Sequence, residues 1–137
     1  MTTRAEDHNS YQARILLAED DDSMRTFLVR ALERAGYEVV AVDRGTAALP
    51  HLANGDFDLL LTDIVMPEMD GIELAQRAAT IAPRMRVMFI TGFAAVALAR
   101  GGGIAPGAKV LSKPFHLRDL VAEIDRLFVD YAPTAGY

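Results

Sequence analysis

The sequence predicts an α/β fold in which a parallel β-sheet carries helices on both of its faces. Short apolar runs alternate along the chain with segments whose apolar residues recur at helical spacing, an order typical of βαβ units. The runs are continuously apolar, which predicts strands that are covered on both sides. The length of 137 residues favours one domain, and 51% hydrophobic with 24% charged residues is typical of a globular protein with a substantial core.

The first half of the chain predicts three strands and two helices. Residues 1–13 are polar and aperiodic, so we expect a loose tail there and order from Arg14 onward. The predicted strands span residues 15–18, 39–42 and 58–62. The first predicted helix ends at residue 35, and the second spans residues 46–52. Asp22 or Ser23 is the expected N-cap of the first helix, and Gly36 ends it. Pro50 is expected to kink or shorten the second helix.

The second half predicts two more strands and three helices. After the loop MPEMDG, helices are expected over residues 72–81, 94–100 and 117–128, and strands over residues 87–90 and 110–112. The glycine triplet 101–103 breaks the middle helix and predicts a short or mobile segment. We therefore expect one domain over residues 14–131, followed by a loose tail over residues 132–137.

Composition argues against several classes of function. The net charge of −5 argues against nucleic-acid binding, because surfaces that bind nucleic acids are positively charged. The absence of cysteine excludes disulfides and thiolate chemistry. The N-terminus has no apolar signal region, and the longest apolar stretch, over residues 87–99, is shorter than the ~20 residues of a spanning helix. The three histidines are dispersed, which argues against a histidine metal site. We expect a cytoplasmic protein without a membrane or nucleic-acid partner.

Chemically reactive side chains stand where the predicted strands end. Glu19 and Asp20 follow the first strand, Asp63 follows the third, Thr91 the fourth and Lys113 the fifth. Because ligands bind outside the carboxyl ends of strands in open α/β sheets, we expect these side chains to converge on one site.

Electrostatics favours a divalent cation at such a site. Two carboxylates about 4 Å apart repel each other by ~4 kcal/mol at an effective dielectric constant of 20. Lys113 supplies one positive charge, and Mg²⁺, which prefers oxygen ligands, would supply two more. A carboxylate beside such a metal can attack phosphorus as a nucleophile, while Thr91 and Lys113 would stabilise the transferring group.

Each feature also has a purely structural explanation. The acidic run after the first strand can simply favour the start of a helix, and Asp63 can be an ordinary turn residue. Thr91 and Lys113 are unremarkable one at a time. The joint occurrence of suitable residues at four strand ends favours the functional interpretation.

These motifs resemble those of bacterial response-regulator receiver domains, over about residues 14–129. The motifs that carry the resemblance are LLAEDD (16–21), LLLTDIVMPEMDG (59–71), FITG (89–92) and LSKPF (111–115). The resemblance implies a flavodoxin-like (βα)5 fold with strand order 2-1-3-4-5. It also implies a cis peptide bond between Lys113 and Pro114.

The resemblance assigns a role to each residue of the site. Asp63 would accept a phosphoryl group from a histidine kinase or a histidine phosphotransfer protein, and Thr91 and Lys113 would contact that group. The ligands implied for Mg²⁺ are Asp20, Asp63, the backbone carbonyl of Val65 and, through a water, Glu19.

The likeness extends to alphaproteobacterial receivers that act as phosphorylation-controlled adaptors of the ClpXP protease. This implies ClpX as a partner of the unphosphorylated form. Two alternatives stay open: another stand-alone receiver of a phosphorelay, and a pseudo-receiver that binds partners without accepting phosphate. An aspartyl-phosphate hydrolase of the haloacid-dehalogenase type is disfavoured, because Val65 stands where that family has a second aspartate.

Three positions depart from the receiver pattern. Val110 occupies a place where many receivers have an aromatic switch residue, so aromatic switching is not expected here. Val65 and Phe93 are apolar and flank the path of a hydrolytic water. We hypothesise that they slow the loss of the phosphoryl group, although both would also serve simply to cover the edge of the core.

Overall fold

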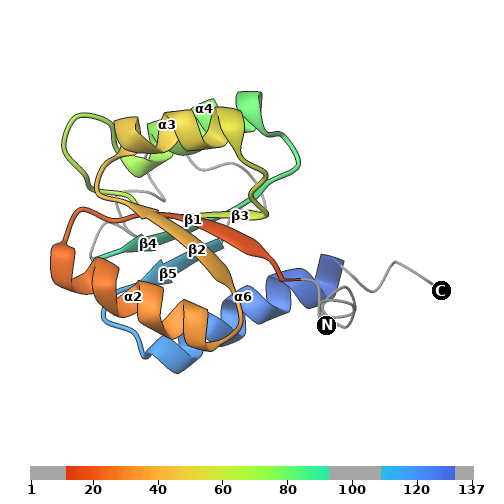
Figure 1. Ribbon diagram of the computed structural model, residues 1–137. Coiled ribbons are helices and arrows are strands. Elements are labelled where there is room, and N and C mark those ends of the chain that lie inside the picture. Colours follow the sequence, from red (N-terminus) through yellow and green to blue (C-terminus); the bar gives the residue numbers. More distant parts are fainter. Residues whose placement is uncertain (1–11, 93–108, 132–137) are drawn as a thin grey trace.

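The computed structural model describes residues 12–92 and 109–131 (Figure 1). Within these ranges the chain forms five strands and four helices. The strands are β1 (Arg14–Ala18), β2 (Glu38–Val42), β3 (Leu59–Asp63), β4 (Arg86–Thr91) and β5 (Lys109–Ser112). The helices are α2 (Asp22–Arg34), α3 (Gly45–Asn54), α4 (Gly71–Ile81) and α6 (Leu117–Tyr131). The helix expected over residues 94–100, the glycine triplet 101–103 and Phe93 lie outside the described residues.

All neighbouring strands are parallel, and their order is β2-β1-β3-β4-β5. This confirms the predicted flavodoxin-like sheet. Helices α3 and α4 cover one face of the sheet, and α2 and α6 cover the other (Figure 1). The carboxyl ends of β1 and β3 lie side by side, because Ala18 pairs with Thr62.

The sheet is buried on both faces, as the continuous apolar runs predicted. All five residues of the central strand β3 are buried. Successive side chains of a strand point to opposite faces. Leu59 and Leu61 therefore pack in the core under α2 and α6, whereas Leu60 packs in the core under α3 and α4. The methionines of strand β4 and of the loop between β3 and α4 are packing residues, since Met66, Met69 and Met88 are all buried.

Aspartates cap the two helices that begin beside the carboxyl ends of β1 and β3. Asp21 is the N-cap of α2 and accepts a hydrogen bond from the Met24 amide at 2.8 Å. The expectation of Asp22 or Ser23 in that role was wrong by one or two residues. Asp70 caps α4 in the same way, through the Glu73 amide at 2.8 Å.

Pro50 does not shorten α3, so that part of the expectation that it would kink or shorten the helix was wrong. The helix continues four residues beyond it, to Asn54. Proline removes one helical hydrogen bond. Ala48 and Leu52 are buried on either side of Pro50, so packing against the sheet holds the helix across this defect.

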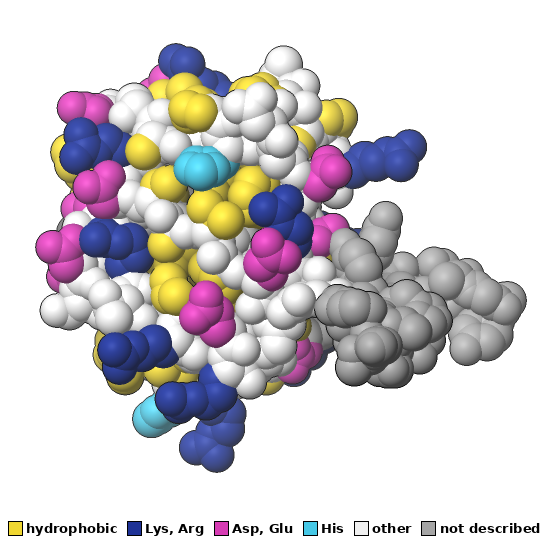
Figure 2. Space-filling view, in the orientation of Figure 1, with side chains coloured by type: hydrophobic (Ala, Val, Ile, Leu, Met, Phe, Trp, Pro, Cys, Tyr) yellow, Lys and Arg dark blue, Asp and Glu magenta, His cyan; other side chains and the backbone are white. Residues whose placement is uncertain are grey.

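The face that carries β2 mixes both signs of charge. Hydrophobic side chains gather along the middle of this face, and acidic and basic side chains lie around them (Figure 2). Among the described residues, the longest helix, α6, has 15 residues, and no helix is long and apolar enough to cross a membrane.

Candidate functional site: a carboxylate cluster closed by a lysine

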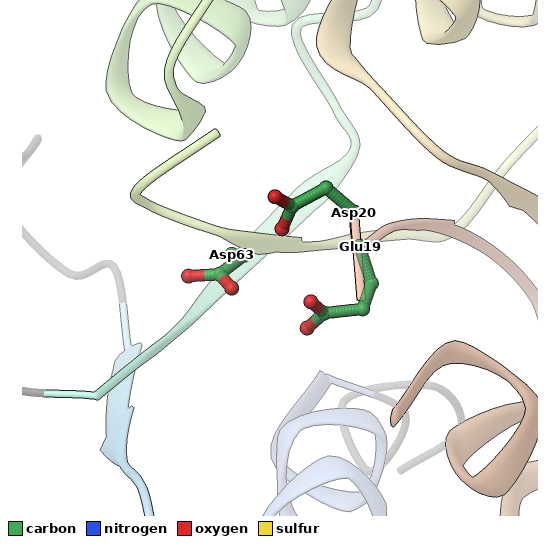
Figure 3. Close-up of side chains that lie close together, drawn as sticks. All are labelled: Glu19, Asp20 and Asp63. Atoms are coloured by element: carbon green, nitrogen blue, oxygen red, sulfur yellow. The ribbon is translucent and has the colours of Figure 1, made fainter. Parts of the chain in front are cut away.

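Three carboxylates meet at the carboxyl ends of β1 and β3. Asp63 is the last residue of β3, and Glu19 and Asp20 directly follow β1. Oxygen atoms of the three side chains all lie within 4.8 Å of one another (Figure 3). Glu19 is fully buried and Asp63 is 6% exposed, whereas Asp20 is exposed. The predicted convergence of these residues is therefore observed.

Lys113 closes the cluster from the end of β5. Its Nζ atom donates to Asp63 Oδ2 at 3.0 Å and to Glu19 Oε1 at 3.3 Å. The main chain fixes its position, because the Lys113 amide donates to the Thr91 carbonyl at 2.6 Å. The Lys113–Pro114 peptide bond is cis, as expected. One ammonium group thus bridges two buried carboxylates.

Burial perturbs the acid–base chemistry of the site. Burial, together with the negative charge of Asp63, raises the pKa of Glu19 to about 7. The hydrogen bond from the Asp21 amide to Glu19 and the charge of Lys113 act in the opposite direction. Burial also acts to lower the pKa of Lys113, but the hydrogen bond to Asp63 and the two carboxylate charges outweigh it, so that this pKa is raised. Lys113 is therefore held as a cation.

The backbone at Asp63 packs closely against the first residue of α4. The Val65 amide donates to Asp63 Oδ1 at 3.3 Å. A Cβ atom at Gly71, the first residue of α4, would lie 2.0 Å from the Asp63 carbonyl oxygen. Only glycine lets the helix start this close to the strand end. The Gly71 amide donates to the Ile64 carbonyl at 2.8 Å, which closes the loop between β3 and α4.

The other predicted site residues occupy the ends of β4 and β5 or the loop after Asp63. Thr91 is fully buried at the end of β4, one residue beyond Ile90, which pairs with Asp63. Val65 is 56% exposed and lies two residues beyond Asp63. Val110 lies in β5 beside Phe89 and packs, partly buried, against Ile64 and Phe89.

The acidic run after β1 divides into different roles, which sequence patterns do not separate. Glu19 and Asp20 join the cluster, Asp21 caps α2, and Asp22 pairs with Arg25 at 2.6 Å. Arg25 was not among the predicted site residues, although its guanidinium also donates to the Glu19 carbonyl at 2.9 Å. A signal was present, because an arginine in the first turn of a helix that follows an acidic run can reach back to that run.

The donor set fits a hard divalent cation. Three carboxylates and one ammonium group leave an excess of negative charge, and the exposed Asp20 opens the cluster to solvent. Two carboxylates 4.8 Å apart still repel each other by ~3.5 kcal/mol at an effective dielectric constant of 20. Oxygen ligands at an open site suit Mg²⁺.

A second hollow lies at the opposite end of the sheet. It has a volume of about 680 Å³, and residues such as Asp56, Phe57, Ile81 and Arg84 line it. Its acidic side chains come from the segment that leads from α3 into β3, and its basic side chains come from the segment that leads from α4 into β4 and from the first residue of β4. We assign function to the carboxylate cluster, because that is where charges of one sign are held together against their mutual repulsion.

Comparisons with known proteins agree with this geometry. Residues 15–125 match the family described as the response regulator receiver domain. The chain is 63% identical over 116 residues to the response regulator receiver protein CpdR of Brucella abortus, a match that covers 85% of this chain and 97% of CpdR. It is also 35% identical over 120 residues to the sensor kinase CckA of the same organism, a match that covers 86% of this chain but 13% of CckA.

A solved structure agrees as well. The CheY-like receiver domain protein from Methanospirillum hungatei superposes with a TM-score of 0.80 at 30% identity. That superposition covers 91% of this chain and 99% of the other.

Proposed function

Because this chain belongs to the response regulator receiver domain family, we propose that it accepts a phosphoryl group on Asp63 and thereby changes its binding to a partner protein. The observation that carries the proposal is the bridge from Lys113 to the two buried carboxylates. A partly buried lysine held between a strand-end aspartate and a buried glutamate is suited to bind a group that brings in negative charge. In this role the protein is a signalling component and a substrate of phosphoryl transfer, not an enzyme with turnover on a separate substrate.

The transfer exchanges one bond to phosphorus for another. A carboxylate oxygen of Asp63 forms a bond to the phosphorus of a phosphohistidine, and the bond from phosphorus to the imidazole nitrogen breaks. The imidazole keeps the electron pair and takes up a proton. Lys113 and Thr91 then contact the oxygens of the new acyl phosphate and stabilise its charge.

A magnesium ion would be held by residues of the cluster. We assign Asp20, Asp63 and the backbone carbonyl of Val65 as direct ligands, and Glu19 as a ligand through a water molecule. When bound, the ion would neutralise charge on the phosphoryl oxygens. The mutual repulsion within the cluster supports this assignment, because a divalent cation would relieve it.

The partners proposed are a phosphohistidine donor and the ClpX unfoldase. The donor would be a histidine kinase or a histidine phosphotransfer protein, as the family membership supports. The unphosphorylated form would bind ClpX and act as an adaptor of the ClpXP protease in the cytoplasm. The identity of 63% over 97% of CpdR supports this choice over that of another phosphorelay receiver. The proposed functional unit is the domain over residues 14–131.

Mass spectrometry of the intact protein tests the phosphoacceptor assignment. We expect a phosphoryl adduct after incubation with Mg²⁺ and acetyl phosphate, and no adduct in Asp63→Asn or in the presence of EDTA. Asp58→Asn is a matched control that should keep the adduct, because Asp58 precedes β3 at the opposite end of the sheet. No adduct in the wild type, even with a phosphohistidine donor, would favour a pseudo-receiver.

Binding to purified ClpX tests the output. We expect the unphosphorylated wild type and Asp63→Asn to bind, and the phosphorylated wild type to bind at least tenfold more weakly, a difference of about 1.4 kcal/mol. A phosphorylated protein without any state-dependent ClpX binding would favour another receiver of a phosphorelay.

The lifetime of the acyl phosphate tests the role of the apolar residues near the site. The Val65 amide donates to Asp63 Oδ1 at 3.3 Å, and the Val65 side chain is 56% exposed to solvent. We expect Val65→Asn and Phe93→Glu to shorten the lifetime of the phosphoryl group, because a polar group can orient a water for attack. An unchanged half-life in both variants would leave these residues with a covering role only.

A further inference from the structure

We propose that Arg25 is a positioning residue whose guanidinium holds the main chain at Glu19, so that Glu19 and Asp20 stay within metal-binding distance of Asp63. The part of this inference that concerns Mg²⁺ rests on the proposed function. The part that concerns the main chain stands on hydrogen bonds that Arg25 makes in the described structure.

Arg25 contacts the acidic loop at three points. Its amide donates to the Asp21 carbonyl at 2.8 Å, within the first turn of α2. Its Nη1 atom donates to the Glu19 carbonyl at 2.9 Å, and its Nη2 atom pairs with Asp22 Oδ1 at 2.6 Å. Through its amide and its side chain, one residue of α2 therefore ties together the residues that link β1 to α2.

Of the two hydrogen bonds made by the Arg25 side chain, the one to the Glu19 carbonyl is better shielded from solvent. The Arg25 side chain is 22% exposed and Glu19 is fully buried, whereas the Asp22 side chain is 87% exposed. A surface pair such as Arg25 with Asp22 contributes little. A charge-assisted bond to the carbonyl of a buried residue is stronger, and a buried carbonyl without a partner is costly.

The Glu19 carbonyl belongs to the peptide that leads into Asp20. The Glu19 amide, on the other side of the residue, donates to the Val42 carbonyl at 3.1 Å. With both sides of Glu19 held, the direction in which Asp20 leaves the strand is fixed. The Asp20 carboxylate thereby reaches the cluster, of which it is the exposed member (Figure 3).

The sign of the effect separates positioning from simple charge. A positive charge near an acidic cluster opposes the binding of a cation, so loss of the Arg25 charge alone would strengthen Mg²⁺ binding. Loss of positioning would weaken it. Lysine keeps the charge but lacks the planar fork that reaches the Glu19 carbonyl and Asp22 at once, so Arg25→Lys isolates the positioning effect.

Calorimetric titration with Mg²⁺ alone provides the first test. We expect Arg25→Lys and Arg25→Met each to raise the dissociation constant on the order of tenfold. Arg77→Lys is the matched control, because Arg77 also pairs with an acid of its own helix, Glu73, at 2.9 Å, but on α4. The control should bind Mg²⁺ as the wild type does. A dissociation constant equal to or lower than that of the wild type in both Arg25 variants would overturn the proposal that Arg25 supports Mg²⁺ binding.

Hydrogen exchange in EDTA provides a second test that needs no metal. The Asp21 amide donates to Glu19 Oε2 at 3.1 Å, so its exchange rate reports whether the loop stays in place. We expect faster exchange at Asp21 in Arg25→Lys than in the wild type, and no change in Arg77→Lys. If the wild type does not bind Mg²⁺, the metal assignment fails, and this measurement alone decides on Arg25. Unchanged exchange at Asp21 would overturn the inference.

Discussion

Removal of the Lys113 charge should destabilise the metal-free protein through the carboxylates that it leaves behind. We choose Lys113→Met, which keeps much of the length of the side chain and removes only the ammonium group. In the wild type, Nζ lies 3.0 Å from Asp63 Oδ2 and 3.3 Å from Glu19 Oε1, and Glu19 is fully buried. Breaking a buried ion pair by removing one partner costs about 3–5 kcal/mol.

The loss should depend on pH, because Glu19 can take up a proton in place of the lost cation. Above the Glu19 pKa of about 7, Glu19 is charged in the wild type, and the loss should be about 3 kcal/mol. Below that pH Glu19 is already neutral, so the loss should be smaller. Mg²⁺ should stabilise Lys113→Met more than it stabilises the wild type, because the ion relieves the greater repulsion.

Urea unfolding followed by circular dichroism measures these changes, in EDTA and in Mg²⁺. Lys109→Met is the matched control: Lys109 also lies on β5 and also pairs with a glutamate at 3.3 Å, but its side chain is 45% exposed. Its loss should be small at every pH, because exposed pairs contribute little. The reasoning is refuted if Lys113→Met is as stable as the wild type in EDTA above the Glu19 pKa, or if the two lysine variants lose the same stability.

Three further predictions concern the surroundings of the cluster. The Glu19 pKa rises from 4.5 in the unfolded chain to about 7 in the folded state, so in EDTA this group should lower the free energy of unfolding as the pH rises between those values. Urea unfolding across this range should show the fall in the wild type relative to Glu19→Gln, and an equal pH dependence in both proteins would contradict it. Gly71→Ala should cost at least about 2 kcal/mol, because the new Cβ meets the Asp63 carbonyl at 2.0 Å, whereas Gly92→Ala should be nearly neutral in thermal unfolding, because its Cβ meets no atom of the described residues within 4 Å. Asp21→Ala should cost about 1 kcal/mol through the lost cap of α2, and equal thermal stability would show that water replaces the cap.

The parts of the fold that follow from burial could be predicted from the sequence. The β1 and β3 runs are apolar because both faces of the sheet are covered. The residue at which each apolar run stops therefore also predicts where the strand ends. Because the site residues stand at those ends, Asp63 and Lys113 could be located without a structure. The order of the strands could not be deduced from periodicity, which carries no information on neighbours, and it came from the resemblance to receivers.

Other features depend on contacts that no local pattern records. Each of three consecutive aspartates has a side chain that can cap α2. Asp21 is the cap because the backbone is still extended at Asp21 and becomes helical at Asp22, a boundary that the sequence does not mark. Pro50 should weaken a helix, but the burial of its neighbours in α3 overrides its local preference. Arg25 bonds to a main-chain carbonyl, and such an acceptor is present at every residue of the sequence.

The bridge made by Lys113 has a consequence for the order in which the protein can become active during synthesis. Lys113 is 94 residues from Glu19 and 50 residues from Asp63 along the chain. A nascent chain therefore displays both carboxylates long before the lysine leaves the ribosome. Contacts between such distant residues form only after the intervening loops have closed. A fragment that ends before β5 should keep Asp63, the proposed acceptor, but lack the bridge, so the proposed competence to accept a phosphoryl group should coincide with completion of the sheet.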